Sequence, residues 1–173
     1  MVLLGDFSIE TVNAQYREGN LNSIFADCNY IIKKPKKYVN INDLTIDGLP
    51  FFAGTIYLER EFELKNPVNQ AILSMNHPDA TILKIFVNGK YVKNLCWEPF
   101  EADISEYLYE NQTNIIGIEL TNSLRNLLGP HHNKDGEIIA VSPHSFGTDD
   151  YSWNEEMNIV RFGGGKNIKI IIK

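Results

Sequence analysis

Few basic residues and no long apolar run are the first features of this 173-residue sequence. It holds 16 Lys and Arg against 22 Asp and Glu, which gives a formal net charge of -6. Because clustered Lys and Arg drive binding to a phosphate backbone, this balance argues against a nucleic-acid partner. The longest apolar runs, such as Ile170–Ile172, fall far short of the ~20 residues that span a bilayer. We therefore expect neither a nucleic acid nor a membrane among the partners.

Cysteine is also scarce. Cys28 and Cys96 are the only two, which is too few for a disulfide framework, and we expect reduced thiols. Pairing would need their Cα atoms to lie close together, which sequence does not establish. The one dense basic run, Lys33–Lys37, contains a proline and is predicted to be a solvated turn. The opening residues, Met1–Asp6, lack the basic and apolar regions of a secretory signal.

A period of two dominates the hydrophobic pattern, which is typical of strands with one wet face. In Thr55–Leu64 apolar and charged residues alternate. We expect Ile56 and Leu58 to face a core, and Tyr57 and Glu59 to face solvent. Helical pattern is confined to two short segments, residues 104–108 and 123–128, each long enough for a turn or two.

The pair Asn88-Gly89 is the clearest turn signal, because both residues accept a positive φ. It predicts a hairpin between Thr81–Val87 and a strand that begins at Lys90. Further strand candidates are Val2–Leu4 or Phe7–Ile9, Ala71–Met75, Ile115–Thr121, Glu137–Val141, Ile159–Phe162 and Ile168–Ile172. The last is almost entirely β-branched, so we expect a central strand covered on both faces.

About eight or nine short strands separated by turn residues predict an all-β fold, an antiparallel β-sandwich. The length suits one domain, so residues 1–173 are expected to form a single module. Apolar segments reach almost to both ends and leave little polar tail. We expect the module to be excised from a longer polypeptide.

Recognised catalytic motifs are missing. There is no Gly-x-Ser-x-Gly, no His-Glu-x-x-His and no phosphate-binding loop, and Gly163–Lys166 is predicted to be a glycine-rich turn between strands. A glycosidase needs two carboxylates across a cleft. Five acids are available, but their spacing pairs no two of them: Glu98, Glu101, Asp103, Asp149 and Asp150. We expect no autonomous catalytic residue.

One segment gathers metal-ligand residue types, and such a set could hold zinc: His131, His132, His144, Asp135 and Glu137. Adjacent histidines on an extended backbone point to opposite sides. We therefore favour a polar loop whose histidines bond to the backbone or to a partner domain. Asp149-Asp150 is a candidate for a structural calcium, and no other cofactor is expected.

Sugar recognition needs exposed aromatic rings beside amides and acids. Trp97, in the run Cys96–Phe100, and Trp153, preceded closely by Tyr151, are flanked by acids and are stacking candidates. The alternative for each tryptophan is a cap on the hydrophobic core. Asn126 is a further ligand candidate, and its alternative is a helix-end or turn residue.

Four motifs follow one another along the middle of the chain. They are a glycine and aromatic pair before a long strand at Gly48–Ile56, a V-N-G hairpin at Val87–Val92, a W-x-P-[FY] run at Trp97–Ile104 and an N-x-[IL] strand at Asn114–Ile118. In this order they resemble the sugar-binding jelly roll of family 2 type glycoside hydrolases. The segment Asn126–His132 is similar to one near the end of large bacterial proteins of the α-L-rhamnosidase-like type.

This resemblance implies a galactose-binding-like β-sandwich, an accessory module beside the catalytic domain of a bacterial enzyme. Two roles stay open, namely non-catalytic carbohydrate binding and a structural buttress that contacts the catalytic domain through Leu127–His132. A third role has His131 or His132 complete the active site of that domain. Asp103 is expected to cap the short turn after it. The parent enzyme is either secreted or cytoplasmic.

Overall fold

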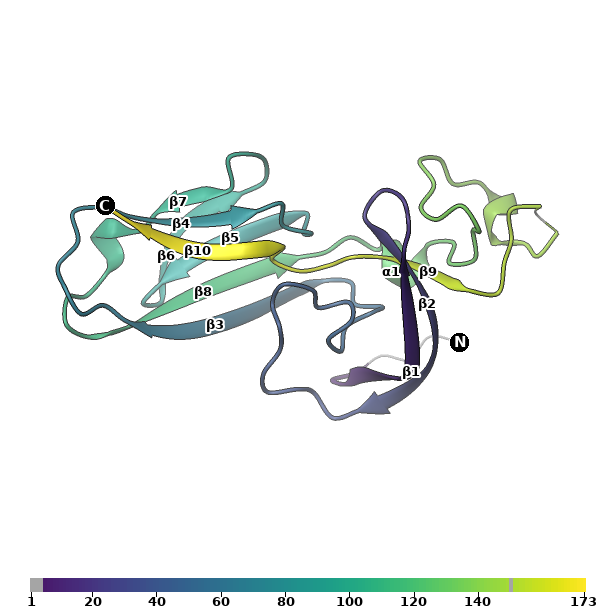
Figure 1. The fold of residues 1–173 in the computed structure, drawn as a ribbon, viewed down its shortest axis with the longest axis horizontal. Coiled ribbons are helices and arrows are strands. Elements are labelled where there is room, and N and C mark those ends of the chain that lie inside the picture. The colour runs from purple at the N-terminus through teal and green to yellow at the C-terminus, as the bar shows by residue number, and fades with distance from the viewer. Residues whose placement is uncertain (1–4, 150) are drawn as a thin grey trace. The chain divides into compact units, whose positions relative to one another are not determined.

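The computed structural model describes residues 5–149 and 151–173, which divide into two compact units (Figure 1). Unit 1 comprises the described residues of Met1–Ala53 and Leu124–Phe162, and unit 2 comprises Gly54–Ser123 and Gly163–Lys173. The chain thus passes from unit 1 to unit 2, returns, and ends in unit 2. Among the described residues, no helix has the length and hydrophobicity needed to cross a membrane.

Unit 2 is an antiparallel β-sandwich, as the sequence predicts. Its strands are β3 (Thr55–Glu63), β4 (Ala71–Asn76), β5 (Ile82–Val87), β6 (Lys90–Leu95), β7 (Glu101–Asp103), β8 (Thr113–Thr121) and β10 (Lys166–Ile172). One sheet has the order β3-β8-β5-β6 and the other the order β10-β4-β7 (Figure 1). A 3-10 turn, η1 (Ser105–Tyr107), follows β7.

The predicted alternation sets the core of this sandwich. Leu83 and Ile85 on β5 and Leu120 on β8 are fully buried, and burial of each such side chain contributes about 1.5–3 kcal/mol. On β3, Ile56 is half-buried, whereas Tyr57 faces solvent, as expected. The inner faces of both sheets therefore supply the core, and the outer face of β3 is wet.

The Asn88-Gly89 hairpin is confirmed. Asn88 and Gly89 have φ of 52° and 75°, and they join β5 to β6. The Asn88 carboxamide donates to the Tyr107 carbonyl at 2.8 Å and to Oδ1 of Asn114 at 2.9 Å. Because Asn114 is fully buried, these bonds tie the hairpin to the start of β8.

Unit 1 is built on a second antiparallel sheet. Its strands are β1 (Ser8–Glu18), β2 (Ser23–Lys33) and β9 (Met157–Val160), in the order β1-β2-β9. Two short helical turns accompany them, α1 (Arg125–Leu128) and η2 (Pro143–Phe146). Phe162 is fully buried and stacks on Phe52 with the ring centroids 5.7 Å apart.

Two strand predictions are wrong. The segment Glu137–Val141 is a loop, since Gly136 turns the backbone with φ of 94° and no strand pairs with the residues that follow, of which Ile139 is 94% exposed. The run Ile168–Ile172 lies within an edge strand rather than a central one, because among the described residues β10 pairs with β4 alone. β-branched composition predicts a strand but not its place in the sheet.

The sequence pattern does not predict the long β1-β2 hairpin. Only Phe7–Ile9 was a strand candidate near β1, and the alternative candidate Val2–Leu4 lies outside the described residues. β2 starts with four buried residues and then mixes Asp27 and Asn29 with apolar neighbours, which blurs its period. Cys28 and Cys96 are free thiols, as expected. Lys33–Lys37 is exposed, as predicted for a solvated turn.

Candidate functional site

An open hollow of about 890 Å³ lies in unit 2, where the end of β4 meets the start of β10 and the segment before β7. We call it the β4–β10 hollow. Its polar wall is formed by two amides, an imidazole, two carboxylates and an ammonium group, from Asn76, Asn167, His77, Glu98, Glu101 and Lys169. These residues come from three parts of the sequence and meet because β10 pairs with β4.

The backbone around this hollow is irregular. The pairing of β10 with β4 shifts between Lys166 and Lys169, which is a β-bulge at Asn167. Asn167 has a φ of 60° and His77 a φ of 46°, values that non-glycine residues rarely adopt. Bulges and such conformations gather at binding sites, where they re-aim side chains. The bulge sets Asn167 in the wall of the hollow.

One contact between an imidazole and a carboxylate lies in the hollow, and one exposed aromatic ring adjoins it in sequence. His77 Nδ1 lies 3.3 Å from Glu98 Oε1, and both side chains are mostly exposed. Because both side chains are exposed, their polar atoms are accessible to a ligand. Trp97, which directly precedes Glu98, is 78% exposed. An indole face thus stands next in sequence to hydrogen-bonding groups, which is the combination that sugar recognition needs.

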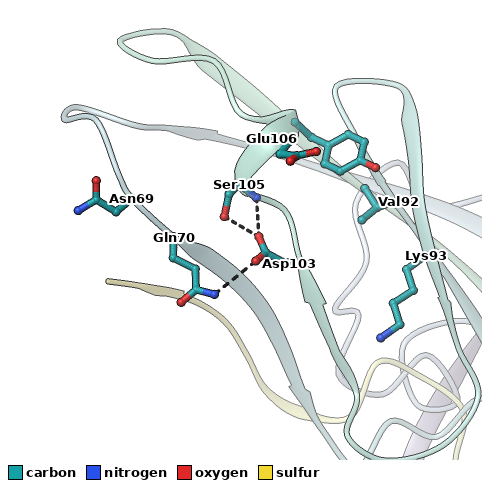
Figure 2. Close-up of a pocket in the computed structure, with 8 residues that line it drawn as sticks. Asn69, Gln70, Val92, Lys93, Asp103, Ser105 and Glu106 are labelled. Carbon is teal, nitrogen blue, oxygen red and sulfur yellow. Dashed lines mark hydrogen bonds between the residues drawn. The ribbon is translucent and has the colours of Figure 1, made fainter.

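A second hollow of unit 2, of about 660 Å³, surrounds Asp103 (Figure 2). Asp103 Oδ1 accepts hydrogen bonds from the backbone N–H of Ser105 at 3.0 Å and from its hydroxyl at 2.5 Å, and Gln70 donates to Oδ2 at 3.3 Å. The bonds from Ser105 hold the pKa of Asp103 below its ordinary value. Asp103 was predicted to cap this turn, but the N-cap position of η1 is Ile104 and has no side-chain cap bond; Asp103 instead bonds the first residue of the turn, Ser105.

Trp153 and Tyr151 lie in unit 1. Trp153 is half-buried and stacks on His132, with centroids 5.5 Å apart and planes 30° apart. His132 Nδ1 is bonded to the Asn154 carbonyl at 3.1 Å. Tyr151 is 89% exposed, and Lys134 Nζ lies 5.4 Å from the centre of its ring. Of the two tryptophans, Trp97 has the more accessible ring, and the two belong to different units.

Asn126 and His131 hold the backbone of unit 1. The Asn126 side chain is 2% exposed, accepts from the Val160 N–H at 2.8 Å and donates to the Val160 carbonyl at 2.7 Å. His131 Nε2 lies 2.9 Å from the Asn126 carbonyl, and its ring meets Phe51 edge-on. Both His131 and His132 thus bond to the backbone, as expected for a polar loop, and they take different partners.

The burial of His131 predicts a pH dependence of stability. Burial is the main cause that lowers its pKa below 6.5, and the nearby Arg125 adds to the shift, against the bond with Asn126. The unfolded chain then binds more protons, so stability is complete above about pH 6.5 and declines below it. We expect the melting temperature to fall from about pH 7.5 to about pH 5.5, and to fall less in His131→Gln. An unchanged pH profile in His131→Gln, or an equal effect of the exposed His144→Gln, would contradict this assignment.

The metal candidates do not assemble among the described residues. In residues 5–149 and 151–173, no three His, Cys, Asp or Glu side chains lie close enough together to hold a metal ion. Asp150, one of the two calcium candidates, lies outside these residues. Its neighbour Asp149 is exposed in a turn.

Sequence reasoning found Trp97 and Glu98 but missed His77 and Asn167. It grouped the other three histidines because they are close in sequence. His77 and Asn167 are 90 positions apart and meet only through the pairing of β4 with β10. No local signal indicates that pairing, although the Gly163–Gly165 turn ahead of β10 marks a tight approach of the backbone.

No family model and no curated protein matches this chain. Among solved structures, a rhamnosidase from Novosphingobium sp. PP1Y matches with 16% identity and a TM-score of 0.55, over 99% of this chain and 16% of that one. This chain shares its fold with part of a rhamnosidase. It spans about a sixth of the length of that enzyme.

Two further structures align less well. A β-D-glucuronidase from Dictyoglomus thermophilum has 16% identity and a TM-score of 0.38, over 99% of this chain and 33% of that one. A glycosyl hydrolase family 2 member from Bacteroides cellulosilyticus DSM 14838 has 20% identity and a TM-score of 0.37, over 68% of this chain and 17% of that one.

Proposed function

We propose that this chain is a non-catalytic carbohydrate-binding module of a bacterial glycoside hydrolase, and that its sandwich is galactose-binding-like. Its two units act as one accessory module that stands beside the catalytic domain. The observation that carries this proposal is the exposure of Trp97, which directly precedes in sequence Glu98 of the polar β4–β10 hollow. The shared fold with part of a rhamnosidase supports the context of a larger enzyme.

Each group has a distinct part in the proposed binding. The apolar C–H face of a sugar stacks on the indole of Trp97. Glu98 accepts hydrogen bonds from two hydroxyls, and His77 and Asn167 fix the remaining ones. Because the hollow is open, a sugar buries little area, and affinity for a single sugar is modest.

Two single-tryptophan variants test the proposal. In Trp153→Phe only Trp97 reports, and in Trp97→Phe only Trp153 does. We titrate both with a panel of monosaccharides and plant or host glycans, with calcium and with chelator, and follow tryptophan fluorescence. We expect a saturable shift in Trp153→Phe and none in Trp97→Phe. Glu98→Gln lowers affinity about ten-fold, since a charge-assisted hydrogen bond contributes ~1.5 kcal/mol.

The exposed Glu110→Gln is the matched control and leaves the titration unchanged. A shift that appears only in Trp97→Phe moves the sugar site to Trp153 in unit 1. A flat response across the panel from a folded protein rules out carbohydrate binding at either tryptophan.

A structural buttress is the second candidate function. The observation in its favour is a set of large apolar side chains that unit 1 leaves exposed: Leu124, Leu128, Ile139, Val141 and Phe146. All five fall within residues 124–146, and a contiguous patch of exposed apolar residues marks a protein contact. Leu128 lies within the predicted contact segment Leu127–His132, and Leu124 precedes it closely. The flat titration described above favours this function.

A further inference from the structure

Three aromatic rings follow one another across the outer face of the four-stranded sheet of unit 2. Tyr57 on β3 meets Phe86 on β5 with ring centroids 5.7 Å apart, and Phe86 meets Tyr91 on β6 at 5.9 Å. Both contacts are edge-to-face, which is a favoured geometry for aromatic pairs. Tyr57 is 45% exposed and Tyr91 51% exposed. We call this surface the aromatic face.

A glycine on β8 permits this arrangement. β8 lies between β3 and β5, and Gly117 is the residue opposite Glu59 on one side and Phe86 on the other. A Cβ at Gly117 would come within 2.2 Å of the Tyr57 hydroxyl oxygen. The phenol of Tyr57 thus occupies the space of the missing side chain and reaches Phe86 across β8.

Hydrogen-bonding groups border the rings. The Tyr57 hydroxyl donates to Glu59 Oε1 at 2.8 Å, and Lys84 Nζ lies 2.5 Å from Glu119 Oε1. Burial, and then the bond to Glu59, raise the pKa of Tyr57 to about 12, so the hydroxyl keeps its proton. Glu61 extends the same side of β3, which leaves the border with an excess of negative charge.

We infer that the aromatic face binds a neutral polysaccharide chain, at a site separate from the β4–β10 hollow. Phe86 stands at 82° to Tyr57 and at 71° to Tyr91, so it separates the two exposed rings. Tyr57 and Tyr91 then offer two stacking surfaces for the apolar faces of sugars in one chain, as aromatic side chains do for bases of a single strand. Glu59 and Glu119 accept hydrogen bonds from hydroxyls, and Lys84 donates to ring or hydroxyl oxygens. The acidic border repels uronates and sulfated glycans, which restricts the class to uncharged chains.

The test uses the Trp97→Ala protein, so that the β4–β10 hollow does not contribute. Its migration is measured in native gels that contain soluble neutral polysaccharides, namely xyloglucan, galactomannan or hydroxyethylcellulose, with polygalacturonate as the anionic probe. We expect a neutral polysaccharide to retard the protein. Adding Tyr57→Ala or Tyr91→Ala lowers the affinity about ten-fold, as for the loss of a central aromatic anchor.

Gly117→Ala is the sharpest variant, because it keeps every aromatic residue and displaces only the Tyr57 ring. The new Cβ would meet only side-chain atoms of Tyr57, at the hydroxyl end of its ring, and these can rotate away. We therefore expect the variant to fold and to lose affinity as Tyr57→Ala does. Tyr38→Ala is the matched control, because Tyr38 is 81% exposed in unit 1. It leaves retardation unchanged.

Several results would overturn the inference. They are retardation that survives Tyr57→Ala and Gly117→Ala, equal retardation by polygalacturonate, and no retardation by any neutral polysaccharide. A concentration-dependent dimer that Tyr57→Ala abolishes would show that a second copy covers the face. None of these results touches the Trp97 titration, so this inference and the proposed function fail separately.

Discussion

Gly165→Ala is expected to destabilise unit 2 by roughly 3 kcal/mol or more, among the largest effects of any single change. Gly165 has a φ of 74°, and a Cβ there would lie 2.4 Å from the His77 carbonyl oxygen and 2.6 Å from that of Asn76. Both atoms belong to the backbone, so neither can move aside cheaply. Denaturant unfolding followed by circular dichroism measures the loss.

Gly89→Ala separates the clash from the backbone strain. Gly89 has almost the same φ, 75°, but nothing lies within 4 Å of the Cβ position. A left-handed conformation alone costs about 1–2 kcal/mol. We expect Gly89→Ala to stay within this cost, and equal losses in the two variants would mean that the close approach of Gly165 to the His77 turn is not required. Asn76 and His77, whose carbonyls the new Cβ would displace, line the β4–β10 hollow, so Gly165→Ala should also weaken sugar binding.

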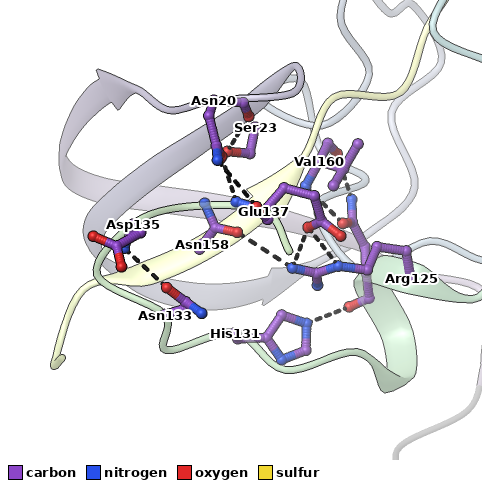
Figure 3. Close-up of polar contacts among 10 residues, drawn as sticks. Asn20, Ser23, Arg125, His131, Asn133, Asp135, Glu137, Asn158 and Val160 are labelled. Carbon is purple, nitrogen blue, oxygen red and sulfur yellow. Dashed lines mark hydrogen bonds and ion pairs between the residues drawn. The ribbon is translucent and has the colours of Figure 1, made fainter. Parts of the chain in front are cut away.

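Arg125→Met is expected to destabilise unit 1, and this is the second of the two largest effects. Arg125 Nη2 lies 2.5 Å from Glu137 Oε2 and 3.2 Å from Asn158 Oδ1, and its Nε lies 2.7 Å from the same Glu137 oxygen (Figure 3). The two charged side chains are only 15% and 16% exposed. Removing the guanidinium leaves a carboxylate with little water around it, which costs about 3–5 kcal/mol. The free energy of unfolding in denaturant gives the value.

Two comparisons make this result interpretable. The double variant Arg125→Met, Glu137→Leu should recover part of the loss, because it removes both charges and leaves neither buried alone. Lys33→Met breaks the pair with Glu10, in which both side chains are 54% exposed, and should cost below about 1 kcal/mol. A loss in Arg125→Met no larger than in Lys33→Met would contradict the role of the buried pair.

The β-sandwich was predictable because its information is local. Alternation along residues 55–64 and the Asn88-Gly89 turn each specify a structure from a few neighbouring residues, and both are confirmed. The place of β10 was not predictable in this way. Its isoleucines predict a strand. Its position at the edge of the sheet depends on which strand it pairs with, and in the described sheet that strand is β4.

The residues of the candidate site also separate into those that local sequence identifies and those that strand pairing brings together. Trp97 and Glu98 were identified because ring and acid are neighbours in sequence. His77, Asn167 and the aromatic face were missed, because they depend on which strands pair and in which register. Tyr57 faces solvent, as expected, but its contact with Phe86 reaches across β8 and has no signal in the sequence. Sequence proximity also grouped His131 and His132, which take separate partners in the structure.

The two indole N–H signals of the ¹H–¹⁵N spectrum test carbohydrate binding at the β4–β10 hollow most directly. The sequence has two tryptophans, so each signal is assigned by one Trp→Phe variant. On titration with the monosaccharides and disaccharides of the panel, we predict that the Trp97 indole and the backbone amides of His77 and Asn167 shift together and saturate. The Trp153 indole stays in place. A shift of the Trp153 indole alone, or no shift of either from a folded protein, would contradict the proposed site.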